Sequence, residues 1–347
     1  MIATLKGIAK RTAITGGLEA SNLLQKFGLM SKARGRAAIF TLHHVRPYVP
    51  GKSPSNRHLE ITPEFLDAAI RQLRADGYTF VSLESLPERL AEPDKGERYA
   101  VFTLDDGFRD NAEFALPVFE RHQVPFTIFV CKGFSERSHT LWWETLEALV
   151  NATDAVVYEF SDGTRQFPVT NLMESWVASH AISAEITKPG EAEAVAHLNA
   201  TAAKYGVDAA ALCKKLIMEA DALKALAQNP LVSLGAHTVS HRALAFLDAE
   251  EASQEFAASA DYVEAITGKR PTTFAYPYGD HRSVTNETCK LAAEAGFSIA
   301  VSTVPGTIDA EALSSPQSLP RISLNGYFQK PRYVSALASG IPFKLKG

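Results

Sequence analysis

Two short stretches combine the side chains that metal-dependent hydrolysis uses. One reads Thr-Leu-Asp-Asp-Gly and places Asp105 and Asp106 side by side at the end of an apolar run. The other reads His-Thr-Val-Ser-His, and its spacing predicts that His237 and His241 lie on one face of a helical turn. Two imidazoles and one carboxylate make a three-ligand metal site with a position left open for water. The second carboxylate is then free for acid–base chemistry, which indicates a hydrolytic metal.

Neither stretch is decisive by itself. Asp-Gly is a common turn signal. A chain with ten histidines can contain two histidines four positions apart by chance. Their joint occurrence beside predicted strands favours a metal centre. Zinc suits two imidazoles and a carboxylate, although cobalt, iron, nickel or manganese can occupy such a site.

The composition is that of an ordinary soluble globular protein, with 46% hydrophobic and 21% charged residues. A length of 347 residues allows one large α/β domain with an insertion, or two domains. The net charge of -4 argues against a general nucleic-acid binder. Three cysteines suggest neither a disulfide framework nor a Cys-x-x-Cys zinc site. The sequence contains no run of about 18 apolar residues, so no transmembrane helix is expected.

Apolar strand patterns alternate with helical patterns along most of the chain. We expect strands at residues 38–42, 79–83, 100–104, 126–130, 231–235, 273–276, 298–302 and 321–324. Such alternation predicts a parallel sheet. The expected fold is an α/β, distorted (β/α) barrel of seven or eight strands with a mostly helical insertion.

The unusual polar residues fall beside these strands. They are His43 and His44 after the first strand, Asp105 and Asp106 after the third, His237 after the fifth, Pro277 and Tyr278 after the sixth, and Arg321 at the start of the last. The loops at the carboxyl ends of barrel strands converge on one site. The placement therefore predicts a single cleft.

Residues 135–229 interrupt the alternation with mostly helical, alanine-rich sequence and a hairpin pattern around Asp162-Gly163. We interpret them as an insertion that forms a lid or a cleft wall. Trp142 and Trp143 near its start either anchor the insertion to the barrel or offer a ring that stacks on a sugar.

Residues 1–36 carry seven basic residues against one acid, Glu19, and are expected to form a basic amphipathic helical segment. Such a helix either packs on the domain or lies on a membrane surface. The stretch lacks the features of a secretory signal, so we expect a cytoplasmic protein, with a location at the inner face of the membrane as an alternative. Residues 37–134 and 230–347 would then form the barrel. No protein partner can be inferred.

The polar motifs resemble those of the polysaccharide deacetylases, the NodB-homology domain of carbohydrate esterase family 4. Their Thr-Phe-Asp-Asp motif is similar to residues 103–106, and their His-Ser/Thr-x-x-His motif is matched fully by residues 237–241. Their Arg-x-Pro-Tyr motif is matched in part by Ala275, Tyr276, Pro277 and Tyr278. The resemblance covers residues 37–134 and 230–325.

The resemblance implies that Asp106, His237 and His241 bind the metal and that Asp105 is the catalytic base. It also implies that the backbone N–H of Tyr278 stabilises the oxyanion. Tyr276, Pro277, Tyr278, Trp142, Trp143 and His44 are the candidate substrate-binding residues.

The sequence departs from the family pattern at two positions. Ala275 stands where the family has an arginine that orients the base, and no histidine follows His281 to serve as the late acid. We predict that Arg321 pairs with Asp105 instead. For the acid, residues 40–45 resemble a segment of deacetylases that act on poly-N-acetylglucosamine, which favours His43, with His44 as the alternative.

Three functions are therefore open. The first is removal of N-acetyl groups from an acetamido sugar in a polysaccharide, an oligosaccharide or a lipid-linked glycan. The second is hydrolysis of another non-peptide amide or a cyclic imide. The third is glycan binding by a catalytically inactive barrel.

Overall fold

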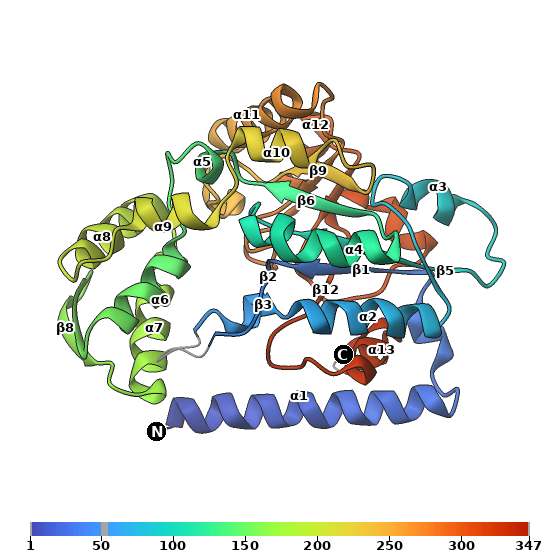
Figure 1. Cartoon of the computed structure of the whole chain (residues 1–347), viewed down its shortest axis with the longest axis horizontal. Helices are drawn as coiled ribbons and strands as arrows, with labels where there is room; N and C mark the ends of the chain where they lie inside the picture. Colours follow the sequence, from blue (N-terminus) through green and yellow to red (C-terminus); the bar gives the residue numbers. More distant parts are fainter. Residues whose placement is uncertain (1, 50–54, 346–347) are drawn as a thin grey trace.

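A parallel sheet at the centre of the molecule curls into a barrel (Figure 1). The computed structural model describes residues 2–49 and 55–345. Within these, the sheet strands are β1 (Ala37–Leu42), β4 (Tyr78–Phe80), β5 (Arg98–Leu104), β6 (Phe126–Val130), β9 (Val232–Ala236), β10 (Thr273–Ala275), β11 (Ile299–Val301) and β12 (Ile322–Ser323). They correspond to the eight strands that the sequence predicts, with small shifts at their ends.

The strands follow the order β11-β10-β9-β6-β5-β1-β12, and β4 pairs with the beginning of β5. Every ladder of this sheet is parallel. Leu319 bridges Val301 of β11, and the residues directly after it pair with β1. One short segment thus connects the two edges, and the predicted distorted barrel is confirmed.

The two faces of the strands carry different cores because successive side chains point to opposite sides. Ile39, Val101 and Phe129 pack together inside the barrel. Their outward neighbours pack against the surrounding helices. Gly235 lies where a Cβ atom would come within 2.5 Å of the Phe129 ring, so the crowded interior requires glycine there.

Helices cover the outside of the barrel. They are α2 (Pro63–Ala75), α3 (Leu86–Ala91), α4 (Leu116–His122), α11 (Ala249–Thr267), α12 (Asn286–Glu294), α13 (Pro331–Ala338) and α14 (Ile341–Lys344). The helix α2 begins as its sequence predicts, with the Thr62 side chain accepting a hydrogen bond from Phe65 N and with Pro63 in the first turn. A short parallel pair, β2 (His44–Val45) and β3 (Glu60–Ile61), has no counterpart in the sequence prediction.

Most of the stretch between β6 and β9 stands to one side of the barrel, whereas its last helix lies over the barrel beside α11 (Figure 1). The stretch contains α5 (Lys132–Ser135), α6 (Trp142–Ala152), β7 (Ala155–Phe160), β8 (Gly163–Pro168), α7 (Leu172–Ile186), α8 (Glu191–Ala203), α9 (Ala209–Leu216) and α10 (Ala220–Leu226). The strands β7 and β8 form the expected antiparallel hairpin. A separate apolar cluster, centred on residues such as Leu149, Ile182 and Leu198, holds the elements from α6 to α9 together. The helix α10 packs instead on the barrel core through Leu223 and Leu226.

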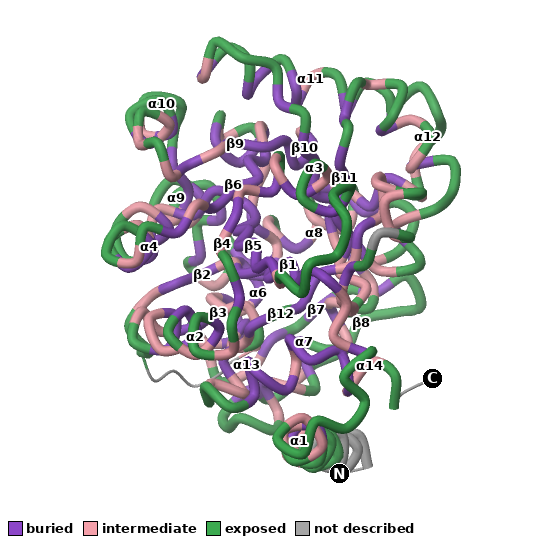
Figure 2. The backbone as a smooth tube through the Cα atoms, turned by 90° about the vertical axis from the view of Figure 1, so that its right-hand side faces the viewer, coloured by how far each residue is buried: buried purple, intermediate pink, exposed green. Residues whose placement is uncertain are grey.

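The long helix α1 (Ile2–Lys26) lies on the outside of the molecule, beneath α13 (Figures 1 and 2). Leu18 packs against Tyr333 and Ala336, and Glu19 forms an ion pair of 2.6 Å with Arg332. The side chains of residues 2–10, at the start of the predicted basic amphipathic segment, lie outside the described part of the structure. None of the described helices has the length and apolarity that crossing a bilayer requires.

Candidate active site

Asp106, His237 and His241 form one buried cluster at the carboxyl ends of β5 and β9. One potential ligand atom from each residue lies within 4.8 Å of the other two. The Asp106 Oδ1 atom is 3.5 Å from His237 Nε2 and 3.4 Å from His241 Nε2. Both carboxylate oxygens of Asp106 are buried, and neither has a hydrogen-bonding partner among the described residues. A divalent cation would satisfy these oxygens, so the residues fit the metal that the sequence predicts.

The ring of His237 is oriented by the strand next to it. Its Nδ1 atom lies 2.6 Å from the carbonyl oxygen of Ala275 at the end of β10. Because a carbonyl can only accept, Nδ1 carries the proton and Nε2 presents its lone pair to the cluster. This is the tautomer that a metal ligand requires.

The two histidines do not share a helical turn, and that sequence prediction is wrong. Residues 237–241 form an irregular loop in which Thr238 and His241 both have positive φ angles, of 62° and 60°. Such backbone is costly for residues other than glycine. Glu255 of α11 compensates by accepting hydrogen bonds from Val239 N at 2.6 Å and Ser240 N at 3.0 Å.

Asp105 is held by Arg321, as predicted. The guanidinium donates two hydrogen bonds of 2.7 Å each, one to each carboxylate oxygen. Arg321 is fully buried, and its Nε–H donates to the backbone oxygen of Ser302 at 2.8 Å. Burial alone would raise the pKa of Asp105, but Arg321 outweighs this effect and holds the pKa below its ordinary value.

The register of the barrel explains how Arg321 reaches Asp105. Ser323 of β12 is level with Thr41 of β1, which is level with Thr103 of β5. Arg321 lies two residues before Ser323 and therefore on the same face, about 7 Å lower along the strand direction. Its long side chain rises through the barrel interior, and its Nη1 atom passes Thr103 Oγ1 at 3.1 Å.

His43 faces the same space from the end of β1. Its Nε2 atom lies 4.0 Å from Asp105 Oδ2, and its side chain is 22% exposed. Burial lowers the pKa of His43 below the ordinary histidine value, although Asp105 and Asp106 oppose this shift. The position suits proton transfer to or from a bound molecule.

His44 does not reach the cleft, and its prediction as a substrate-binding residue or alternative acid is wrong. The side chain is fully buried, with Nδ1 at 2.5 Å from Asp110 Oδ2 and Nε2 at 3.6 Å from Glu144 Oε1. Burial opposes a charged ring, but the two carboxylates prevail and raise the pKa of His44 to about 9. His44 is therefore an imidazolium that connects the barrel with α6.

The turn after β10 is held by residues of the 135–229 stretch. Trp142 Nε1–H donates to the hydroxyl oxygen of Tyr278 at 2.9 Å, and that hydroxyl donates in turn to Glu191 of α8. Tyr278 has a φ angle of 60°, so its backbone occupies the left-handed region. Trp143 is buried and its ring centroid lies 4.9 Å from that of His241, which makes it an anchor.

Tyr276 and Pro277 contribute less to the surface of the cleft than predicted. The Tyr276 hydroxyl donates to the Gln317 backbone oxygen at 2.8 Å, so only its nearly buried ring touches the cleft. Pro277 is buried and does not line the cleft, which contradicts its prediction as a substrate contact.

A cavity of about 630 Å³ opens above these groups. Its floor holds Asp105, Asp106 and the cluster histidines. Its walls carry the aromatic side chains Trp142, Trp143, Trp176, Tyr278 and Tyr327. The volume lies within the usual range of small-ligand sites, and aromatic walls with a few polar groups are typical of them.

A family comparison agrees with the motifs that line this cavity. The model of the polysaccharide deacetylase family matches residues 178–300, a segment that includes His237, His241 and Tyr278. Over this segment, which is less than half of the chain, the sequence is similar to the polysaccharide deacetylase family. The match supports a hydrolase of the de-N-acetylase class. Among curated proteins, none matches the sequence.

Solved deacetylases share the fold of this chain. The deacetylase PplD of Streptococcus pyogenes, solved in complex with acetate, is 18% identical, with a TM-score of 0.55 over 84% of this chain and 92% of that chain. IcaB of Ammonifex degensii is 15% identical, with a TM-score of 0.52 over 89% and 97%. A polysaccharide deacetylase of Bacillus cereus is 16% identical, with a TM-score of 0.52 over 88% and 68%.

Several residues around this site were not recognisable from sequence. Glu191 and Glu255 hold residues of the site, and Asp110 and Glu144 hold the buried His44 beside it, all through contacts that are set only by folding. A weak signal exists for Glu255 alone, which falls in the amphipathic helix directly after the histidine motif. Acidic residues are too common on helix surfaces for that signal to select it.

Proposed function

We propose that the protein is a metal-dependent N-deacetylase that acts on acetamido sugars in a glycan. The observation that carries the proposal is the arrangement on the cavity floor. There a three-ligand cluster, an arginine-bound carboxylate and a partly exposed histidine lie together below aromatic walls. These are the groups that hydrolysis of an unactivated amide requires.

Asp106, His237 and His241 would hold the metal, and zinc is the cation that best suits this donor set. When bound, the metal supplies Lewis-acid activation of water and of the acetamide carbonyl. Asp105, kept ionised by Arg321, takes the proton of the attacking water. The Tyr278 backbone N–H is proposed to stabilise the developing oxyanion. His43 protonates the departing amine from its place beside Asp105.

The walls support a glycan as substrate. Trp142 and Trp176 line the cavity, and the Trp176 ring stacks on His180 at 5.0 Å between centroids. Flat rings of this kind pack against the apolar face of a sugar. Both α6 and α7 thus contribute to the proposed sugar-binding wall.

The experiment is a direct measurement of acetate. Protein loaded with zinc, cobalt, nickel, iron or manganese is incubated with N-acetylglucosamine oligomers, with lipid-linked acetamido sugars and with a cyclic imide. We expect acetate from an acetamido sugar, loss of turnover after chelation and recovery with one of the metals. Asp106→Asn should lose metal content and turnover while it retains the wild-type circular dichroism spectrum.

The other outcomes separate the alternatives. Hydrolysis of the cyclic imide without acetate release would favour a different amide substrate. Sugar binding without turnover under any metal would favour an inactive glycan-binding barrel. Full activity of Asp106→Asn or of the chelated protein would contradict metal dependence.

We also propose a peripheral contact of α1 with an anionic membrane surface on the cytoplasmic side, which would bring the enzyme to a lipid-linked glycan. Leu23 and Phe27, which are 56% and 73% exposed, lie near the exposed Lys26. Apolar side chains beside basic ones suit the surface of an anionic bilayer. Flotation with phosphatidylglycerol vesicles tests the contact, and equal binding by wild type and Phe27→Glu would contradict it.

A further inference from the structure

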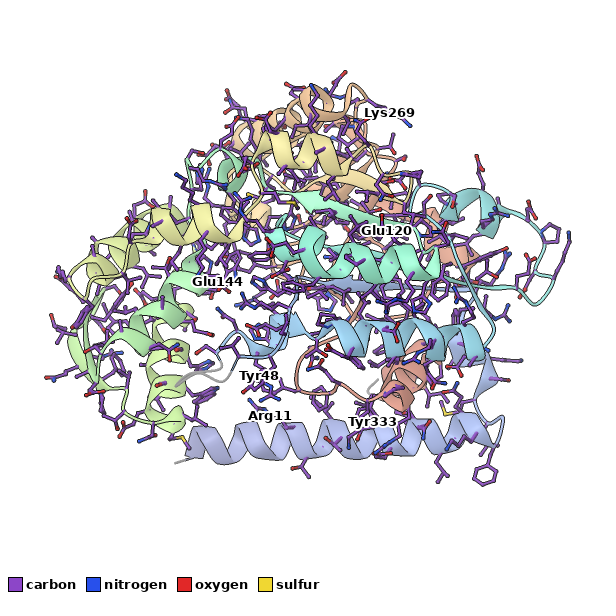
Figure 3. All side chains as sticks on the ribbon, viewed as in Figure 1. Arg11, Tyr48, Glu120, Glu144, Lys269 and Tyr333 are labelled. Carbon is purple, nitrogen blue, oxygen red and sulfur yellow. The ribbon has the colours of Figure 1, made fainter. Side chains whose placement is uncertain are left out.

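The helix α1 supplies a positive charge to the wall of the catalytic cavity. Arg11 lines the cavity together with the floor residues, although more than ninety positions separate it from them in sequence. Figure 3 shows its side chain pointing from α1 towards the body of the molecule. Among the described residues that line the cavity, Arg11 is the only lysine or arginine.

The carboxylates that line the cavity cannot neutralise this charge. They are Asp105 and Asp106, and both belong to the floor, where Arg321 and the histidine cluster engage them. No carboxylate of the described chain forms an ion pair with Arg11 within 4.0 Å. His58 also lines the cavity, but burial lowers its pKa, so it adds little positive charge near neutral pH.

Arg11 is held in place by the side chain of Tyr327. Its guanidinium carbon lies 3.8 Å from the centroid of the Tyr327 ring, which also lines the cavity. Stacking on an aromatic face orients the planar guanidinium. Arg11 also makes a side-chain hydrogen bond with Tyr327, and a guanidinium has five N–H donors, so others remain for a ligand. The helix itself is fixed beyond this point by Leu18 in its apolar contact with α13. The result is an oriented donor fork at the rim of the substrate cavity.

We propose that Arg11 binds an anionic group, a phosphate or a carboxylate, on the same glycan whose acetamide reaches the cavity floor. The inference rests on the proposed function, since it assumes that the glycan occupies this cavity. A guanidinium pairs with either anion through two parallel hydrogen bonds. The preferred substrate is accordingly an acidic or phosphorylated glycan, and a neutral oligomer leaves the fork unused.

The test compares three probes with the same number of sugars. They are triacetylchitotriose, its reducing-end aldonic acid and its reducing-end phosphate. Binding is followed by tryptophan fluorescence, because Trp142, Trp143 and Trp176 all line the cavity. We expect wild-type protein to bind one or both charged probes about tenfold more tightly than the neutral probe at low salt. High salt should reduce that preference.

Variants of α1 show whether Arg11 causes the preference. Arg11→Ala and Arg11→Gln should abolish it and leave the affinity for the neutral probe unchanged. Arg11→Lys should keep part of it, because the charge persists without the fork. Lys26→Ala removes an exposed charge from the same helix and should behave as wild type. Unchanged melting temperatures confirm that α1 remains docked.

Each result has a definite meaning. Equal binding of the three probes by wild type, absence of binding by both charged probes, or a preference that survives Arg11→Ala would overturn the inference. Acetate release is measured separately on the same samples. Selective binding without acetate release would contradict the proposed activity alone, whereas acetate release without charge preference would contradict the role of Arg11 alone.

Discussion

At the scale of single residues, neighbouring side chains give the two adjacent aspartates different tasks. Asp105 meets the fork of Arg321 and becomes an oriented, ionised carboxylate. Asp106 has a φ angle of 74° and turns towards His237 and His241, where its oxygens have no other partner. The chain thus gives two adjacent carboxylates the different surroundings that the proposed base and the proposed metal ligand need.

Replacement of Arg321 tests the base. Arg321→Ala should raise the pKa of Asp105, because the guanidinium that lowers it is removed. The pH below which activity falls should therefore move upward. We expect kcat/KM to fall about 10²- to 10⁴-fold, the range of general base catalysis. The measurement is a pH–rate profile from pH 4 to 9.

Folding must be checked in that variant, since loss of a buried partner costs about 3–5 kcal/mol. Arg321→Lys keeps a charge and should shift the profile less than Arg321→Ala. Arg332→Ala removes an arginine of the exposed ion pair with Glu19 and serves as the matched control. A normal rate and an unshifted profile in Arg321→Ala would rule out the pairing as a catalytic requirement.

The enzyme should be active only while His43 carries its proton. Burial lowers its pKa, so wild-type activity should decline with rising pH from a midpoint below the ordinary histidine value. His43→Ala should lose about 10²- to 10⁴-fold in kcat and should also lose this alkaline decline. The same pH–rate measurement on both proteins decides the matter. Retention of the decline in His43→Ala would assign it to another group.

At the scale of secondary-structure elements, ionic and hydrogen-bonded contacts join the 135–229 stretch to the barrel. Glu144 of α6 faces His44, and Figure 3 labels it at that junction. Asn56 Nδ2 donates to Glu144 at 2.9 Å and to the Trp143 backbone oxygen at 3.0 Å. These contacts place the helix that carries both tryptophans against the cavity.

Stability should depend on the charge of His44. Its pKa is raised to about 9 in the folded protein, so the imidazolium stabilises the fold fully below its unfolded pKa of about 6.5. The contribution, about 3 kcal/mol from the shift, should be lost as the pH rises through 9. Urea unfolding at pH 6 and pH 9.5 should show a smaller pH dependence in His44→Gln than in wild type.

An exposed histidine provides the control for this comparison. His281→Gln removes an exposed histidine. We expect its free energy of unfolding to change between pH 6 and pH 9.5 by as much as that of wild type. If His44→Gln loses as much stability as wild type between pH 6 and pH 9.5, the imidazolium does not hold α6 in place.

At the scale of the whole molecule, α1 brings the N-terminal part of the chain to the substrate cavity. Its attachment combines the buried Leu18, which is 3% exposed, with the exposed ion pair of Glu19 and Arg332. Apolar burial stabilises such a contact far more than a solvent-exposed ion pair does. The position of Arg11 therefore depends mainly on Leu18.

Two substitutions compare these contributions. Leu18→Ala should lower the free energy of unfolding by about 2–4 kcal/mol through the loss of buried surface and the cavity that remains. Glu19→Ala should cause a change too small to resolve by urea unfolding. Equal destabilisation by the two substitutions would show that the ion pair, and not the apolar contact, holds α1.

The sequence alone predicted the barrel strands, because buried parallel strands are apolar runs between helical patterns. It also predicted the cluster of Asp106, His237 and His241 and the Asp105–Arg321 contact, since each residue either belongs to a motif or fills a gap in one. It failed where contacts join distant elements. His44 is adjacent to His43, yet a β-strand alternates its side chains, and His44 points to Asp110 and Glu144 while His43 faces the cavity.

The chemistry of the site was therefore determined by local sequence, and its walls were decided by tertiary structure. Motif residues follow strands, and the ends of parallel strands converge in any barrel of this kind. The loop of His237 and His241 could not be predicted, because its left-handed residues are stable only with Glu255 beneath them. Nor could Arg11 be predicted, because it reaches the cavity only through the docking of α1 on α13.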